Sequence, residues 1–526
     1  MIFIIGSGLS AIATAMALAE RGYRPTMLDA GLPPGEEARE LKQRLSATEP
    51  ELWKETDLIK LRRTGRAALN GIPRKLYFGS DFVFQEAAGA APLDVRQASV
   101  YRSFAAGGFS NVWGAVLQPM ESRDMQRWPF GPAEMAPHYS AVHALMCDAG
   151  PGGMTDRTFP AHALDGGPEP SAQARAFHAD LASAGETLKG RGIRFEYPRL
   201  AVLSADRDGR GGCRYCGQCI YGCPYDSIFT SSAALQRLIR AGRVRCEAGV
   251  LVNRLTPEKG KILIEGRSLN DGATRQFRGD TVFVAAGFLE TARITLDSLG
   301  LYDTQLQVRH SDIFTLPLVR YRATPGILRE KLHTLCQLVV EIEDRTICPD
   351  YVRLQIYGYN DLYARLFCRK MGSLAPLLQG VSRALARRLF VVFGYLHSDS
   401  SSSVTLSLTR DSKLRVVGQV NPRAELICRA VSRKLFRNRR YLRAVPLPFQ
   451  LKMDLPGGGY HSGGTFPMRQ VPRGLETDIW GTLSALPGVH IVDASVLPSV
   501  PASPLAFTVM ANAHRIASKC VVRDDS

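Results

Sequence analysis

Four cysteines lie in one short segment of the chain, CRYCGQCIYGCP: Cys213, Cys216, Cys219 and Cys223. Their CxxCxxCxxxCP spacing is that of a bacterial ferredoxin run, in which thiolates hold an iron-sulfur cluster. The first three would hold one cluster, with Cys223 or a remote cysteine as the fourth ligand. Four thiolates also suit zinc, although structural zinc sites usually pair two CxxC units across a longer loop. A metal-free packing loop is the third alternative, and the residues alone leave all three open.

A strand, a glycine turn and a helix follow one another at the start of the chain, IFIIGSGLSAIATAMALAE. Ile2–Ile5 is a short apolar run suited to a strand that is buried on both faces. Gly6 and Gly8 then form a tight turn that lets the backbone approach a pyrophosphate, and the small Ala11 lets the helix pack close to the strand. The helix, expected over about Leu9–Glu20, directs its positive N-terminal end at the phosphates.

An acidic residue stands where a ribose would be bound. After Arg21 and Gly22 end the helix, the segment PTMLD predicts a second strand that ends at Asp29. In dinucleotide-binding βαβ units, a carboxylate about 20 residues after the glycines accepts a hydrogen bond from a ribose hydroxyl. The whole arrangement predicts a dinucleotide site, with a ligand-free βαβ turn as the alternative, and does not decide between FAD and NAD.

The composition is that of a soluble globular protein with two or more domains. Of its 526 residues, 45% are hydrophobic and 22% are charged. No apolar stretch approaches the roughly 20 residues of a membrane-spanning helix, and the opening MIFIIGSG does not have the features of a secretory signal. The eleven cysteines do not have the regular spacing of a secreted disulfide framework. We therefore expect a cytoplasmic protein.

Part of the net charge of +17 is concentrated in two segments. Residues 429–443 contain seven arginines and lysines and no acidic residue, and Arg429, Arg433, Arg437 and Arg440 recur at helical spacing. A second basic and apolar segment, SRALARRLFVVF, covers residues 382–393. These segments predict either a solvated helix face or attraction to an acidic partner, an acidic substrate or anionic lipid at the inner membrane face. No nucleic-acid recognition module is visible, so no nucleic-acid partner is expected.

Further blocks complete a pattern along the chain. AAGGFSNVWGA occupies residues 105–115, VFVAAGFLETARITLDSLG residues 282–300, HSGGTFPM residues 461–468, and VHIVDASVLPSVPASPLAFTVMANAHRIA residues 489–517. In this order and at these separations, the blocks resemble the glucose-methanol-choline (GMC) family of FAD-dependent oxidoreductases. Residues 301–449 are unmatched except for FGYLHSDSSSSV.

The resemblance implies an α/β fold, α+β overall, with two domains. A Rossmann-like FAD-binding domain would be assembled from the discontinuous segments 1–130, 200–310 and 456–526. A substrate-binding domain with an antiparallel sheet would comprise residues 131–199 and 311–455. The alternation VTLSLTR at residues 404–410 suits a strand of such a sheet.

The same resemblance implies which residues bind FAD. The glycines of the first turn would hold the diphosphate, Asp29 would bind the adenosine ribose, and a second glycine pair would also approach the diphosphate. Asp493 and the helix after it would lie against the isoalloxazine side. The positions expected to contact FAD are Gly6, Gly8, Ala11, Asp29, Gly107, Gly108, Asn111, Trp113 and Asp493.

Oxidising an alcohol with a flavin requires that the hydroxyl proton leaves while a hydride reaches the flavin. A neutral imidazole suits the proton transfer, and His461 stands at the position of the family's HxxGT histidine. The family usually has a second His or Asn beside it, but the matching position here is Pro504, which has no side-chain donor or acceptor. Ser503 is adjacent. His397 is a candidate for the missing group, with a structural, sheet-facing histidine as the alternative.

These residues predict an FAD-dependent oxidoreductase that acts on a CH–OH group of a small-molecule alcohol or sugar. Some sugar dehydrogenases of the family are similar in carrying a three-iron cluster on three cysteines, at a spacing that Cys213, Cys219 and Cys223 match. An iron-sulfur cluster would pass electrons to an external electron acceptor, which favours a dehydrogenase over an oxidase. The alternative, suggested by Pro504, is an FAD-binding protein that has lost turnover and acts as a binding or assembly component.

Overall fold

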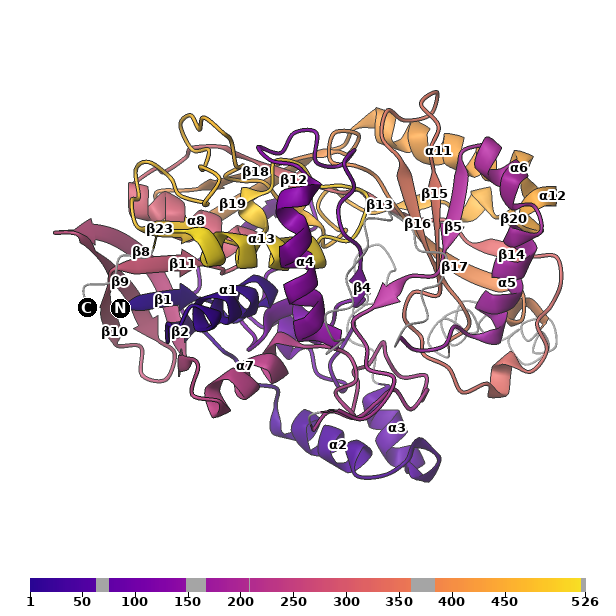
Figure 1. Cartoon of the computed structure of the whole chain (residues 1–526), viewed down its shortest axis with the longest axis horizontal. Coiled ribbons are helices and arrows are strands. Elements are labelled where there is room, and N and C mark those ends of the chain that lie inside the picture. Colours follow the sequence, from indigo (N-terminus) through magenta and orange to yellow (C-terminus); the bar gives the residue numbers. More distant parts are fainter. Residues whose placement is uncertain (63–74, 148–166, 208, 361–383, 522–526) are drawn as a thin grey trace.

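The computed structural model describes residues 1–62, 75–147, 167–207, 209–360 and 384–521. Within this part of the chain, a parallel sheet with its helices forms one end of the molecule and a large antiparallel sheet forms the other (Figure 1). Both chain termini lie at the end with the parallel sheet. This is the mixed α/β architecture, with a Rossmann-like region and an antiparallel region, that the sequence predicts.

The parallel sheet has five strands in the order β23-β11-β1-β2-β7. Its central strand β1 is buried at all four positions, as expected for an apolar strand covered on both faces. The sheet is assembled from distant parts of the sequence: β1 Ile2–Ile5, β2 Thr26–Asp29, β7 Arg245–Ala248, β11 Thr281–Val284 and β23 Val489–Ile491. The predicted first strand and the predicted end of the second strand at Asp29 are therefore confirmed.

Helix α1 (Leu9–Glu20) covers this sheet and has the predicted bounds. Ala11 is fully buried in it, where a larger side chain would separate the helix from its neighbours. The C-terminal helix α13 (Ala506–Lys519) packs along α1, and α4 (Pro132–Cys147) packs against α13. Helix α8 (Phe288–Leu299) begins directly after β11, at the glycine turn of Gly287. A small antiparallel sheet, β8 Val250–Glu258, β9 Lys261–Ser268 and β10 Thr274–Gly279, lies beside α8.

The large antiparallel sheet has the strand order β20-β14-β17-β16-β15-β5, with β13 and β21 attached to β17. Buried aromatic and aliphatic side chains of this sheet pack against α5 (Ala172–Ala182) and α11 (Pro422–Arg437). The rings of Phe390 in the sheet and Phe177 on α5 have centroids 4.9 Å apart. The strands are β5 Ile193–Glu196, β13 Ile313–Thr315, β14 Leu318–Arg320, β15 Leu338–Ile342, β16 Val352–Tyr357, β17 Leu389–Tyr395, β20 Ala444–Pro446 and β21 Lys452–Met453.

A second five-stranded sheet has the order β22-β12-β18-β19-β3. Its strands are β3 Leu93–Arg96, β12 Leu306–His310, β18 Ser403–Leu408, β19 Leu414–Gln419 and β22 Ser462–Gly463. The predicted strand at residues 404–410 is thus present as β18, but it packs into the same hydrophobic core as β1 and α1. Helix α4 also belongs to that core. The division of the chain into two domains stays a prediction.

The described residues contain no helix that is both long and apolar enough to cross a membrane.

Shorter elements complete the fold. The remaining helices are α2 Glu36–Ser46, α3 Glu55–Leu61, α6 Gly185–Gly190, α7 Ser231–Arg240 and α12 Arg439–Leu442, and β4 Val116–Leu117 pairs with β6 Arg199–Leu200.

Candidate active site

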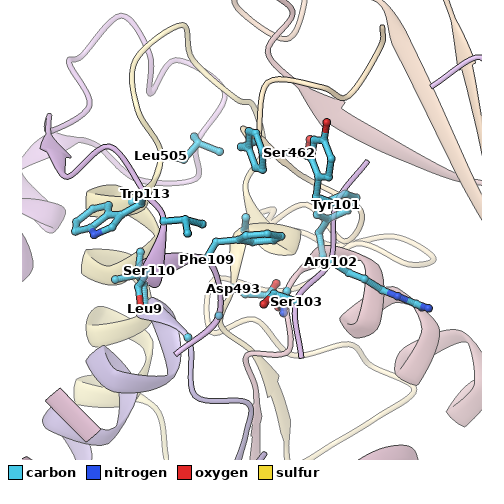
Figure 2. A pocket seen from close by; sticks show the side chains of 18 of the residues that line it. Leu9, Tyr101, Arg102, Ser103, Phe109, Ser110, Trp113, Ser462, Asp493 and Leu505 are labelled. Atoms are coloured by element: carbon cyan, nitrogen blue, oxygen red, sulfur yellow. Dashed lines mark hydrogen bonds between the residues drawn. The ribbon is translucent and has the colours of Figure 1, made fainter. Parts of the chain in front are cut away.

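One cavity of about 490 Å³ extends from the glycine turn after β1 to the antiparallel sheet. Figure 2 shows side chains from several separate segments around it, among them Leu9, Phe109, Trp113 and Asp493. We call one set of lining residues the glycine wall, formed by Gly6, Ser7, Gly8 and Gly108, and a second set the sheet wall, formed by Gln355, Tyr357, Phe393 and Tyr395.

The glycine wall depends at Gly6 on a backbone position that only glycine fills. Gly6 has φ +98°, and a Cβ atom there would lie 2.5 Å from the carbonyl oxygen of Ala285, at the end of β11. At Gly8 an added Cβ would meet no atom within 4 Å, so open space lies there. An added Cβ at Gly108 would lie 3.9 Å from the Cα of Gly8. The two glycine turns, about a hundred residues apart in sequence, therefore face each other.

Ser7 joins the two glycine turns to the acid at the end of β2. Its hydroxyl donates to Asp29 Oδ2 over 2.5 Å and accepts from the Gly107 amide over 2.8 Å. Burial raises the pKa of Asp29 to about 6, although hydrogen bonds from Ser7 and from the backbone of Gly31 and Ala30 oppose the shift. Asp29 lines the cavity, as a ribose-binding carboxylate must.

Two of the residues predicted to contact FAD lie in the second glycine turn, at residues 107–111, without lining the cavity. Gly107 and Asn111 are not among the described residues that line the cavity. The Asn111 amide donates to the carbonyls of Ala106 (2.9 Å) and Gly108 (2.8 Å), so it stabilises the turn. Trp113 does line the cavity, and its indole donates to the Phe229 carbonyl over 2.8 Å.

Asp493 lies at the cavity with both carboxylate oxygens engaged. Oδ2 accepts from the Gly287 amide at 2.8 Å and from the Thr291 hydroxyl at 2.5 Å, and Oδ1 accepts from the Ser495 amide at 2.9 Å. Burial raises its pKa. The side chain therefore fastens the segment after β23 to the first turn of α8, and its assignment as an FAD contact stays a prediction.

His461 also lines this cavity, just before β22. The ring stacks on Tyr395, with centroids 4.9 Å apart and an interplanar angle of 23°. Its Nδ1 atom is buried, and neither ring nitrogen has a hydrogen-bond partner among the described residues. Burial lowers the pKa of His461 to about 4, so the imidazole is neutral at pH 7. A neutral imidazole with free nitrogens can accept a proton from a bound hydroxyl.

The structure does not bring His397 into the cavity. His397 is buried in the loop after β17, where its Nδ1 accepts from the Asp399 amide over 3.2 Å. This loop bonds instead to the segment before Pro504, because the Ser398 amide donates to the Val500 carbonyl over 2.8 Å. Pro504 does line the cavity, whereas the buried Ser503 is not among the residues that do.

The sheet wall supplies polar groups that the sequence analysis missed. Gln355 and Tyr357 lie two positions apart on β16 and so face the same side of the sheet. The Tyr357 hydroxyl donates to Gln355 Oε1 over 2.9 Å. The alternation of polar and apolar residues in RLQIY is the signal present in the sequence, but it does not show which side faces a cavity.

Two cations also lie at the cavity, and their surroundings differ. Arg102 is buried and donates to Glu290 over 2.9 Å and to Glu86. Lys75 donates to the Trp113 carbonyl over 2.8 Å and has no carboxylate partner among the described residues. Burial lowers the pKa of Lys75 to about 8. Lys75 therefore brings a positive charge to the cavity beside Trp113.

The chain resembles known proteins in its fold. Neither protein-family models nor curated protein sequences match it. Among solved structures, its fold is similar to that of pyridoxine 4-oxidase from Mesorbium loti. The two chains are 17% identical, 98% of each is covered, and the TM-score is 0.59. Because the likeness to pyridoxine 4-oxidase covers nearly the whole chain, it supports a GMC-like fold for both ends of the molecule.

The four-cysteine segment reaches the cavity through Ile220, whereas none of its four cysteines is among the residues that line it. The amide of Thr334, a cavity residue, donates to Cys219 Sγ over 3.4 Å. Burial raises the pKa of Cys213 to about 12 and also raises those of Cys216 and Cys219, and the neighbouring cysteines add to the shifts. Among the described residues, which include all four cysteines, no group of three or more His, Cys, Asp or Glu side chains could hold a metal ion. The structure therefore does not support the iron-sulfur or zinc alternative.

Proposed function

We propose that this chain is an FAD-dependent oxidoreductase that oxidises a CH–OH group of a small alcohol or sugar-type substrate. The observation that carries the proposal is the single cavity that joins two facing glycine turns to a neutral histidine. The fold, similar to that of an enzyme named pyridoxine 4-oxidase, supports the same class of reaction.

The glycine wall fits the diphosphate and ribose of FAD. The space at Gly8 is open, and α1 begins there without a side-chain cap and without an acidic residue in its first turn. The first amides of α1 are therefore available to bind phosphate oxygens. Asp29, held by Ser7, would accept from the ribose. Bound FAD would supply the acceptor for the substrate hydride.

The residues of the chain would handle the proton and the orientation of the substrate. A ring nitrogen of His461 accepts the hydroxyl proton, and stacking on Tyr395 fixes the plane of the imidazole. Because the Pro504 side chain has no donor or acceptor, we assign the second polar contact to the sheet wall. The Gln355 oxygen accepts from Tyr357, which leaves its amide to donate to the substrate.

The proposed function covers the oxidation of the substrate and not the choice of electron acceptor. The sequence favoured a dehydrogenase because of a predicted iron-sulfur cluster at Cys213, Cys216, Cys219 and Cys223, but the described residues form no group that could hold a metal ion. Iron and acid-labile sulfide assays on protein purified without oxygen test the cluster directly. The rates of reoxidation by oxygen and by ferricyanide then identify the type of electron acceptor.

The proposed function is tested by identifying the cofactor and then surveying alcohols. We expect mass spectrometry of the released chromophore to show FAD, and we expect the visible absorbance to bleach when a substrate is added without oxygen. The survey would include sugars, sterols and aliphatic alcohols, as well as pyridoxine because of the similar fold. FAD that no alcohol reduces would favour the binding or assembly component suggested by Pro504, and absence of FAD would overturn both.

A further inference from the structure

A group of exposed arginines lies at the end of the molecule farthest from the parallel sheet. On α11 and α12, the residues at 426, 429, 433, 437 and 440 follow one another at three- and four-residue intervals and share a face. Arg433, Arg437 and Arg440 on this face are exposed. None of these three has an ion-pair or hydrogen-bond partner within the described ranges of the chain.

The strand ends beside α12 bring more arginines to the same place. The Tyr321 amide, just after β14, donates to the Arg443 carbonyl over 2.9 Å, and Arg388 donates to the Tyr321 carbonyl over 2.5 Å. Figure 1 shows α6, α11, α12, β14 and β20 together at this end. We call the exposed residues gathered here the arginine face: Arg191, Arg322, Arg387, Arg433, Arg437 and Arg440, with Tyr321, Phe436 and Tyr441.

Two acids near the arginine face, Asp180 and Glu425, are paired with other arginines. Asp180 is buried, where Arg320 donates to it over 2.5 Å and Arg443 over 3.3 Å. Glu425 forms an ion pair with Arg429 four residues later, at 2.5 Å. Both carboxylates are therefore already matched by arginines that we do not count in the arginine face.

Apolar side chains stand among these charges. Phe436 and Tyr441 are 43% and 38% exposed, and Leu426, on the same side of α11, is 62% exposed. The guanidinium of Arg439 lies 4.5 Å from the Phe436 ring centroid, and that of Arg191 lies 4.8 Å from the Tyr441 ring centroid. Basic residues interleaved with exposed aromatic and aliphatic ones match the boundary between lipid headgroups and acyl chains.

We propose that the arginine face docks on a bilayer surface rich in anionic phospholipid. Its arginines would contact the headgroup phosphates, while Leu426 and Phe436 would enter the acyl boundary. A nucleic acid would satisfy the arginines but would give the exposed Leu426 no apolar environment, so lipid is the favoured partner. This inference does not depend on the proposed oxidation of alcohols.

Vesicle sedimentation tests this inference with the whole protein. We expect it to sediment with phosphatidylglycerol-containing vesicles at low salt and to remain in solution with phosphatidylcholine alone. Because each arginine near an anionic surface contributes about fivefold in affinity, R433Q/R437Q/R440Q should bind about 100-fold more weakly. Added salt should weaken wild-type binding, since it screens these charges. L426S/F436S should lower affinity even at high salt.

The matched control removes the same charge elsewhere. Arg24, Arg240 and Arg243 are exposed at the opposite end, near β2 and α7, so R24Q/R240Q/R243Q should bind vesicles like wild type. Unchanged thermal midpoints would show that both triple variants are folded. Failure of wild type to sediment, or equal loss in both triple variants, would overturn the proposal. So would arginine-dependent binding to an oligonucleotide without binding to vesicles.

Discussion

The two walls of the cavity are built from different parts of the polypeptide. The glycine wall presents backbone, because Gly6, Gly8 and Gly108 have no side chains. Gly6 and Gly108 have positive φ angles, and the backbone after β11 leaves no room for a Cβ atom at Gly6. The sheet wall presents side chains, because Gln355 and Tyr357 project from a regular strand that would accept many other residues. A backbone position such as Gly6 restricts the residue type strongly, whereas a position on the surface of a strand restricts it weakly. We therefore expect the glycine wall to tolerate substitution poorly, and we expect substitutions in the sheet wall to change the preference for substrate without affecting the fold.

The largest effect of substitution on stability is expected at Gly6. A Gly6→Ala change places Cβ 2.5 Å from the Ala285 oxygen and strains a φ of +98°, so we expect a loss of about 2–4 kcal/mol in stability. Gly22→Ala is the control, since Gly22 also has positive φ but no neighbour within 4 Å, and it should cost about 1 kcal/mol. Thermal unfolding of both variants measures the difference, and equal midpoints would contradict the role of packing at Gly6.

A smaller effect is expected on the sheet wall. Gln355→Ala and Tyr357→Phe each remove a neutral hydrogen-bonding group, so kcat/KM should fall about tenfold with bound FAD and thermal midpoint unchanged. Gln276→Ala, on the exposed strand β10, is the matched control and should leave kinetics as they are. If steady-state kinetics showed no change in either sheet-wall variant, Gln355 would not be the partner that replaces the residue missing at Pro504.

The smallest change in kcat/KM near neutral pH is expected from the titration of His461. Burial lowers its pKa from 6.5 to about 4, so the neutral base is present above that pH and is lost as the pH falls through about 4. The profile of kcat/KM should therefore be flat from pH 7 to about 5 and fall near pH 4. A fall centred near 6.5 instead would show that His461 titrates as an exposed imidazole or that another group is the base.

Sequence reasoning identified the first glycine turn because its requirements are local. Gly6, Gly8, Ala11 and Asp29 lie within one βαβ unit, where the turn, the close helix packing and the strand end each require a particular residue type. The bounds of α1 followed from the same unit.

Sequence reasoning could not orient side chains that depend on long-range packing. Asn111 stands in the expected block, yet its amide bonds to its own turn, which a block match does not show. His397 follows a strand of the antiparallel sheet, but long-range contacts such as that between Ser398 and Val500 hold its loop outside the cavity. Gln355 and Tyr357 form the sheet wall because β16 pairs with β17 and β15, a register set by residues far away in sequence.

The central claim is that His461 removes the hydroxyl proton in a cavity that holds FAD at its other wall. Stopped-flow reduction of the FAD-loaded protein by its alcohol tests this claim most directly. We predict that His461→Ala retains FAD and slows reduction by about 10²–10⁴-fold, while His143→Ala, whose ring lies on α4 outside the cavity, reacts like wild type. Reduction at the wild-type rate in His461→Ala would contradict the account.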